Sequence, residues 1–161
     1  MAALDPKQAP NHLEATFMRL VFHNIGAQDL SKRGYTPGNA PVEALLLDIE
    51  ADLSIEEDGR TLWSEELFQV AELAYELARW LQVPEEDRGN FDLDSMDWAE
   101  RGVIRIVRSD DGWRVGTVLE PDLWTAPMSW NDLVAEIRRF DCAVREATAS
   151  LGINPDFIPS A

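Results

Sequence analysis

The most constraining feature of the sequence is an alternation of apolar and polar residues in the segment from Leu45 to Glu56. Apolar side chains fall at every second position from Leu45 to Ile55, and from Asp48 onward the positions between them carry acids or serine. A period of two is typical of a β-strand with one face buried and the other in water. Asp58 and Gly59 follow, and both tolerate the positive φ of a tight hairpin turn. The pattern therefore predicts a strand, a turn and a return strand at 60–63.

Two helices and several further strands are expected in the rest of the chain. The first helix begins at Ser64, a good N-cap, and ends before Pro84, which disfavours the helical conformation of the preceding residue. The second begins at Ser129 and ends near Gly152, which suits a left-handed C-cap. Both segments carry apolar residues at helical spacing. The further strands are expected at 17–24, 91–98, 103–109 and 113–120.

These elements predict a single α+β domain over residues 17–158, after a flexible N-terminal arm at 1–16. Their order is βββαβββα. Hairpins followed by helices favour an antiparallel sheet of about six strands, with the two main helices on one face. One local alternative stays open, because the beginning of the alternation, after Pro41, also suits a short helix.

The acidic residues are concentrated in one part of the chain. Residues 43–100 contain eighteen Asp or Glu and three Arg, and so carry nearly all of the formal net charge of −16. Such a segment repels nucleic acid and anionic membranes, and it attracts cationic partners. We therefore expect a basic protein as the partner, with no nucleic acid and no membrane.

The expected location is the cytoplasm. Cys142 is the only cysteine, so the chain has no intramolecular disulfide. The N-terminus lacks the basic and apolar regions of a secretory signal. No apolar stretch approaches the roughly 20 residues that span a bilayer.

We expect the outward carboxylates of the predicted sheet to bind basic residues of the partner. Acids on alternate positions of a strand lie about 7 Å apart on one face and repel one another unless a cation offsets them. Trp98 lies on the same face of its predicted strand as Asp92 and Asp94, and we expect it to be the main aromatic contact with the partner. A merely solvated face, partly paired with arginines, is the alternative. The predicted partner-binding residues are Asp48, Glu50, Asp52, Glu56, Asp92, Asp94 and Trp98.

Known catalytic and metal-binding motifs do not fit the sequence. A calcium loop beginning at Asp92 would need an oxygen ligand at its fifth position and glycine at its sixth, where Met96 and Asp97 stand. The two histidines lack partners at zinc spacing. We expect no metal, no cofactor and no catalytic residue. The runner-up function is a small enzyme or a domain that binds a small-molecule ligand in a pocket between the sheet and the helices.

Three segments carry a resemblance to a known group of proteins: residues 49–53, residues 103–113 (VIRIVRSDDGW) and the closing helix at 130–151. They resemble small uncharacterised actinobacterial proteins, which in size and strand–helix order are similar to immunity proteins that neutralise bacterial toxins. The resemblance covers residues 17–158. It implies inhibitor-like binding, such as an immunity or antitoxin-like inhibitor of a basic, nuclease-like partner, and it assigns no functional residue.

Overall fold

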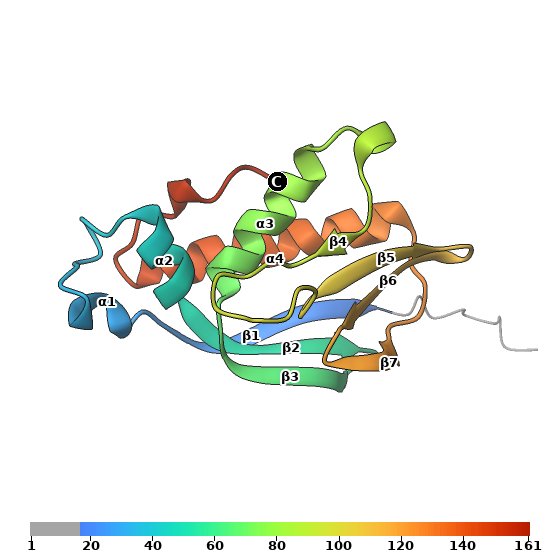
Figure 1. The fold of residues 1–161 in the computed structure, drawn as a ribbon, viewed down its shortest axis with the longest axis horizontal. Coiled ribbons are helices and arrows are strands. Elements are labelled where there is room, and N and C mark those ends of the chain that lie inside the picture. Colours follow the sequence, from blue (N-terminus) through green and yellow to red (C-terminus); the bar gives the residue numbers. More distant parts are fainter. Residues whose placement is uncertain (1–16) are drawn as a thin grey trace, which may run out of the picture.

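The computed structural model describes residues 17–161, so the arm predicted at 1–16 lies outside the described residues. The alternating segment forms β2 (Glu50–Glu57), the central strand of an antiparallel sheet of order β1-β2-β3 (Figure 1). Its neighbours are β1 (Met18–Gly26) and β3 (Arg60–Phe68). Asp58 and Gly59 both have positive φ, which confirms the predicted hairpin turn between β2 and β3.

Helices replace strand or loop in the segment before β2. The predicted strand at 45–48 is wrong, and the alternative of a short helix after Pro41 is confirmed by α2 (Val42–Asp48). Leu45 and Leu46 are both buried, as a helix that packs along a broad apolar face allows and a half-buried strand does not. The segment between β1 and α2 also contains one short helix, α1 (Asp29–Lys32).

The first long helix, α3 (Val70–Gln82), begins later than the sequence suggests. Ser64 lies in β3, opposite Ser54 of β2, and does not cap the helix. The return strand therefore continues beyond residue 63 to Phe68, although these residues also favour a helix. Pairing with β2 is preferred because it buries Trp63 and Phe68. The predicted end before Pro84 is confirmed, since Val83 is extended.

The second half of the chain forms its own antiparallel sheet of order β4-β5-β6-β7, so the single six-stranded sheet that we predicted is wrong. The strand expected at 91–98 contains only two residues, and an additional strand begins at Glu120, where the strand predicted at 113–120 was expected to end. Two short 3-10 turns lie at Glu85–Asp87 and Pro155–Phe157. The strands are β4 (Phe91–Asp92), β5 (Arg105–Ser109), β6 (Gly112–Thr117) and β7 (Glu120–Trp124).

The last helix, α4 (Trp130–Ser150), confirms both of its predicted ends. The Ser129 side chain accepts a hydrogen bond from the Asp132 amide, and Gly152 has a φ of 80°. In Figure 1, α3 and α4 lie on the same side of β1-β2-β3. No helix within residues 17–161 is both long and apolar enough to cross a membrane.

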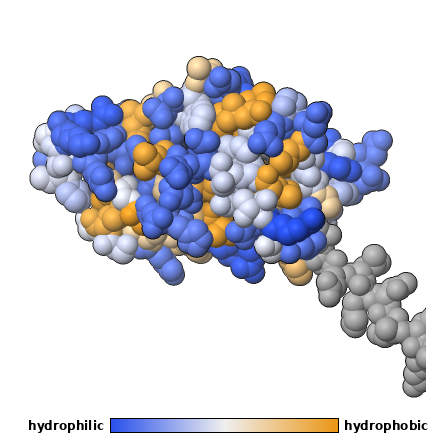
Figure 2. Space-filling view, turned by 90° about the horizontal axis from the view of Figure 1, so that it is seen from below, coloured by the Kyte–Doolittle hydropathy of each residue, from blue (hydrophilic) through white to orange (hydrophobic). Residues whose placement is uncertain are grey.

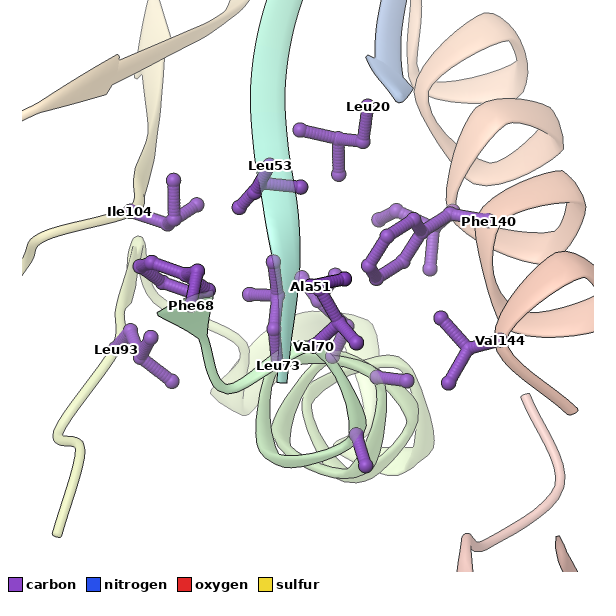
Figure 3. Packing of buried hydrophobic residues seen from close by; sticks show 14 of the residues in the cluster. Leu20, Ala51, Leu53, Phe68, Val70, Leu73, Leu93, Ile104, Phe140 and Val144 are labelled. Atoms are coloured by element: carbon purple, nitrogen blue, oxygen red, sulfur yellow. The ribbon is translucent and has the colours of Figure 1, made fainter. Parts of the chain in front are cut away.

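One hydrophobic core joins the two sheets and the two long helices. Figure 3 shows Ile104 and Leu93 beside Phe68, while Phe140 and Val144 extend from α4 toward the same centre. These side chains are almost fully buried. The space between the first sheet and the helices, where the runner-up function would place a pocket, therefore holds packed side chains.

A charged pair on α4 protects the outer edge of β1. The Glu136 carboxylate accepts a hydrogen bond from the Leu20 amide at 3.0 Å, and Arg139 donates to the Leu20 carbonyl at 2.7 Å. The two side chains also bind each other, with 2.8 Å between Arg139 Nε and Glu136 Oε2. The pair thus satisfies the backbone groups that a further strand would otherwise bind.

The edge contact predicts a specific loss of stability. In Glu136→Ala, the buried Leu20 amide loses its acceptor, so the free energy of unfolding should fall by about 2 kcal/mol. Chemical denaturation measures the change. The control is Glu146→Ala, an exposed position on the same helix, which should change stability by no more than about 0.5 kcal/mol. Equal effects of the two variants would contradict the role of Glu136.

Candidate functional site

Two backbone irregularities face each other across one end of β2. The pairing of β1 with β2 shifts between His23 and Gly26, and the pairing of β2 with β3 shifts between Ala51 and Leu53. Each irregularity contains a residue other than glycine with positive φ: Asn24 at 58° and Leu67 at 53°. Bulges of this kind often lie next to functional sites, where they redirect side chains.

Asp52 connects both irregular segments. One carboxylate oxygen accepts a hydrogen bond from the Asn24 side chain at 2.9 Å, and the other accepts from the Leu67 amide at 3.3 Å. Asp52 therefore holds the two neighbouring strands in their bulged conformations. A leucine with positive φ is sterically strained, so this contact compensates part of an unfavourable backbone conformation.

A surface hollow of about 300 Å³ lies at the same end of the sheet. Three of its lining residues are acids and one is a lysine. We call it the acidic hollow. It is lined by Asn24, Gly26, Gln28, Asp29, Lys32, Asp48, Glu50 and Leu67.

Glu50 has an unusual electrostatic environment. Its pKa is raised, first because the carboxylate is partly buried and then because Asp29, Asp97 and Asp48 are close by, while Arg33 acts in the opposite direction. Among residues 17–161, Glu50 forms no salt bridge. Its negative charge is therefore the least compensated one in the hollow.

The nearby cations are already engaged. Lys32 forms a salt bridge with Asp29 at 2.9 Å, and Arg33 forms one with the buried Asp48 at 2.9 Å. Residues 17–161 contain no group of three or more His, Cys, Asp or Glu side chains that could hold a metal ion. The chemistry that the hollow offers is thus attraction of a cationic group that carries its own hydrogen-bond donors.

The loop after β4 brings a further acid to the site. Gln69 donates a hydrogen bond to Asp97 at 2.9 Å and accepts one from the Trp98 indole at 3.2 Å. Glu72, which is almost fully buried, accepts a hydrogen bond from the Met96 amide at 3.2 Å. These contacts fix the loop against the start of α3 and place Asp97 close enough to Glu50 to affect its pKa.

The structure brings together only some of the predicted site residues. Asp48, Glu50 and Asp52 lie at the acidic hollow, although Asp48 ends a helix and is paired with Arg33. Glu56 faces Arg19 toward the other end of β2 and lines a different hollow.

The other three lie elsewhere. Asp92 and Asp94 are exposed on and after β4, in the second sheet. Trp98 packs against Phe68 and binds Gln69, so it is held partly in the core. The predicted row of acids on one face is therefore not formed, and the partner-binding role of each residue stays a prediction.

Sequence reasoning missed four contributors to this site: Asn24, Asp29, Leu67 and Asp97. Leu67 lies within the helix that the sequence predicts from Ser64 onward, but the residue belongs to β3 and its side chain is 65% exposed. The one available signal was an Asn–x–Gly sequence at the end of a strand, at Asn24 and Gly26, which indicates a bulge. Nothing local in the sequence places Asp29 or Asp97 near Glu50.

The strain at Leu67 predicts that a glycine there stabilises the protein. In Leu67→Gly, relief of the left-handed conformation is worth about 1–2 kcal/mol and exceeds the added chain flexibility of about 0.5–1 kcal/mol. The free energy of unfolding should rise by about 0.5–1 kcal/mol. Leu67→Ala is the control, because it keeps the strain and loses only exposed side-chain atoms, and it should stay within about 0.5 kcal/mol. A less stable glycine variant would contradict this interpretation.

Glu72 predicts a pH dependence of stability. Burial raises its pKa, against opposing hydrogen bonds from Ser95 and Met96, and one of its carboxylate oxygens has no partner in the described chain. The folded protein therefore binds this proton more tightly than the unfolded chain does, so the contribution of Glu72 to stability falls as pH rises. The unfolding free energy of the wild type relative to Glu72→Gln should decrease between about pH 4 and pH 7. Glu146→Gln is the control, because it removes the same charge from an exposed position. If the unfolding free energy of the wild type relative to Glu72→Gln increased with pH, the role of Glu72 would be contradicted.

Comparison with known proteins gives a single finding. A family profile matches residues 29–149, about three quarters of the chain, including the acidic hollow from Asp29 onward. No curated protein and no solved structure matches. The chain therefore belongs to the family described as "Domain of unknown function (DUF7878)".

Proposed function

We propose that this chain is a protein-binding module that binds a cationic side chain of a basic partner protein in the acidic hollow. The observation that carries the proposal is the environment of Glu50, a partly buried carboxylate next to three other acids and without a salt bridge in residues 17–161. A lysine or arginine from a partner would offset this charge and lower the repulsion among the acids.

The charge distribution of the whole chain supports the same function. Its net charge of −16 attracts basic proteins over a longer range and speeds their encounter, an effect that weakens as salt screens the field. The hollow adds the local contact that such general attraction lacks.

The proposal keeps the binding function of an immunity or antitoxin-like inhibitor but not a row of carboxylates that imitates nucleic-acid phosphates. That row would need Asp48, Glu56 and Asp92 on one surface, and these residues lie in different places. Inhibition of the partner stays a prediction.

The proposal can be tested with a lysine peptide, acetyl-GKSGKSGK-amide, by isothermal titration calorimetry. Binding should weaken as sodium chloride is raised from about 20 to about 300 mM. Glu50→Gln should weaken binding by about three- to fivefold at low salt, as expected for one ion pair near the surface. The peptide should shift the amide signals of Asn24 and Leu67 in nuclear magnetic resonance spectra.

The matched control is Glu146→Gln, which removes the same charge from an exposed position on α4, outside the hollow. Its effect should be less than about twofold, because only the long-range field changes. Equal effects of the two variants would show that the peptide senses net charge alone, and the hollow would lose its proposed role.

A further inference from the structure

We propose that Leu67 and Met96 form an apolar anchor beside the acidic hollow, and that it binds an apolar side chain that the partner carries next to its lysine or arginine. This inference rests on the proposed function and specifies the second half of the contact. The occupant is thus a basic protein segment in which cationic and apolar residues alternate or adjoin.

Both anchor residues are unusually exposed for their type. Leu67 is 65% and Met96 is 51% exposed, although long apolar side chains are usually buried. Figure 2 shows that the face seen from below is mostly hydrophilic, with hydrophobic patches set among the polar residues. An apolar patch with a polar rim is typical of a protein-interaction surface.

One buried side chain joins the segments that carry the two residues. The Gln69 amide nitrogen contacts the Leu67 carbonyl at 3.4 Å and the Asp97 carboxylate at 2.9 Å. Met96 directly precedes Asp97 in the chain. The segments that carry Leu67 and Met96 are therefore both hydrogen-bonded to the Gln69 side chain. Leu67 also lines the acidic hollow, so the anchor adjoins the proposed cation site.

The backbone keeps Leu67 on the surface. The bulge of β3, the positive φ and the hydrogen bond from the Leu67 amide to Asp52 hold this residue away from the buried face of the sheet. Phe68, the next residue, is fully buried. Strained residues occur most often at functional sites. An exposed leucine in a strained conformation is therefore consistent with a contact to a partner protein.

Charge complementarity identifies the partner. Glu50 lines the hollow together with Leu67, and Asp97 follows Met96 in the chain. The nearby cations Lys32 and Arg33 are paired with other acids. An anionic membrane would be repelled, and a purely apolar partner would leave these carboxylates desolvated without compensation. A segment with both an apolar and a cationic side chain satisfies both halves of the surface.

The test compares two peptides that differ only in their apolar content, acetyl-GKSGKSGK-amide and acetyl-GKLGKLGK-amide. The wild type should bind the leucine peptide about fivefold more tightly, because a leucine side chain is partly removed from water. Leu67→Ala should abolish this preference, so that the two peptides bind with equal affinity. Leu119→Ala, at a residue that is 38% exposed between β6 and β7, should preserve the preference.

The outcomes separate this inference from the proposed function. Equal binding of the two peptides by the wild type, or an equal loss of both in Leu67→Ala, overturns the anchor while cation binding in the hollow stands. Failure of both peptides to bind the wild type overturns the proposed function itself. A shift of the Met96 methyl signal by the leucine peptide alone is the second expected readout, and circular dichroism verifies that the variants are folded.

Discussion

The structure depends on the two-sided environment of β2. Its inward residues Ala51, Leu53 and Ile55 are fully buried, and they contribute to the core that both long helices and the second sheet share. The residues that alternate with them point outward, are only partly exposed and include Glu50, Asp52 and Glu56. Because side chains alternate along a strand, burial of one set fixes the direction of the other. The hydrophobic core thereby positions the carboxylates of the candidate site.

Asp52 relates the stability of the sheet to the shape of the site. It binds both Asn24 and Leu67, the residues with positive φ in the two strands that flank β2. Its carboxylate is therefore engaged within the protein, while Glu50 two residues earlier has no such partner among residues 17–161. Neighbouring acids on one strand face thus have different roles, one holding the backbone and the other offering charge. The left-handed conformation of Leu67 costs stability, and the binding role that we propose for this surface would explain why it is retained.

Much of the fold could be predicted wherever a local signal had no strong competitor. The hairpin at Asp58 and Gly59 and the cap at Ser129 depend on backbone preferences that act within a few residues. The start of α3 could not be predicted in this way, because Ser64 has a good cap signal but pairs with β2 instead. Division into two sheets also depends on contacts between distant segments, which the order of strands does not specify.

The amino-acid pattern alone shows that β2 has one apolar and one acidic face, and that nearly all of the net charge of the chain lies between residues 43 and 100. Which acids share a site depends on the packing of distant segments. It pairs Asp48 with Arg33, places Asp92 in another sheet, and brings Asp29 and Asp97 toward Glu50. Periodicity reports the direction of side chains along one element, whereas the proximity of residues on different elements depends on how the core packs.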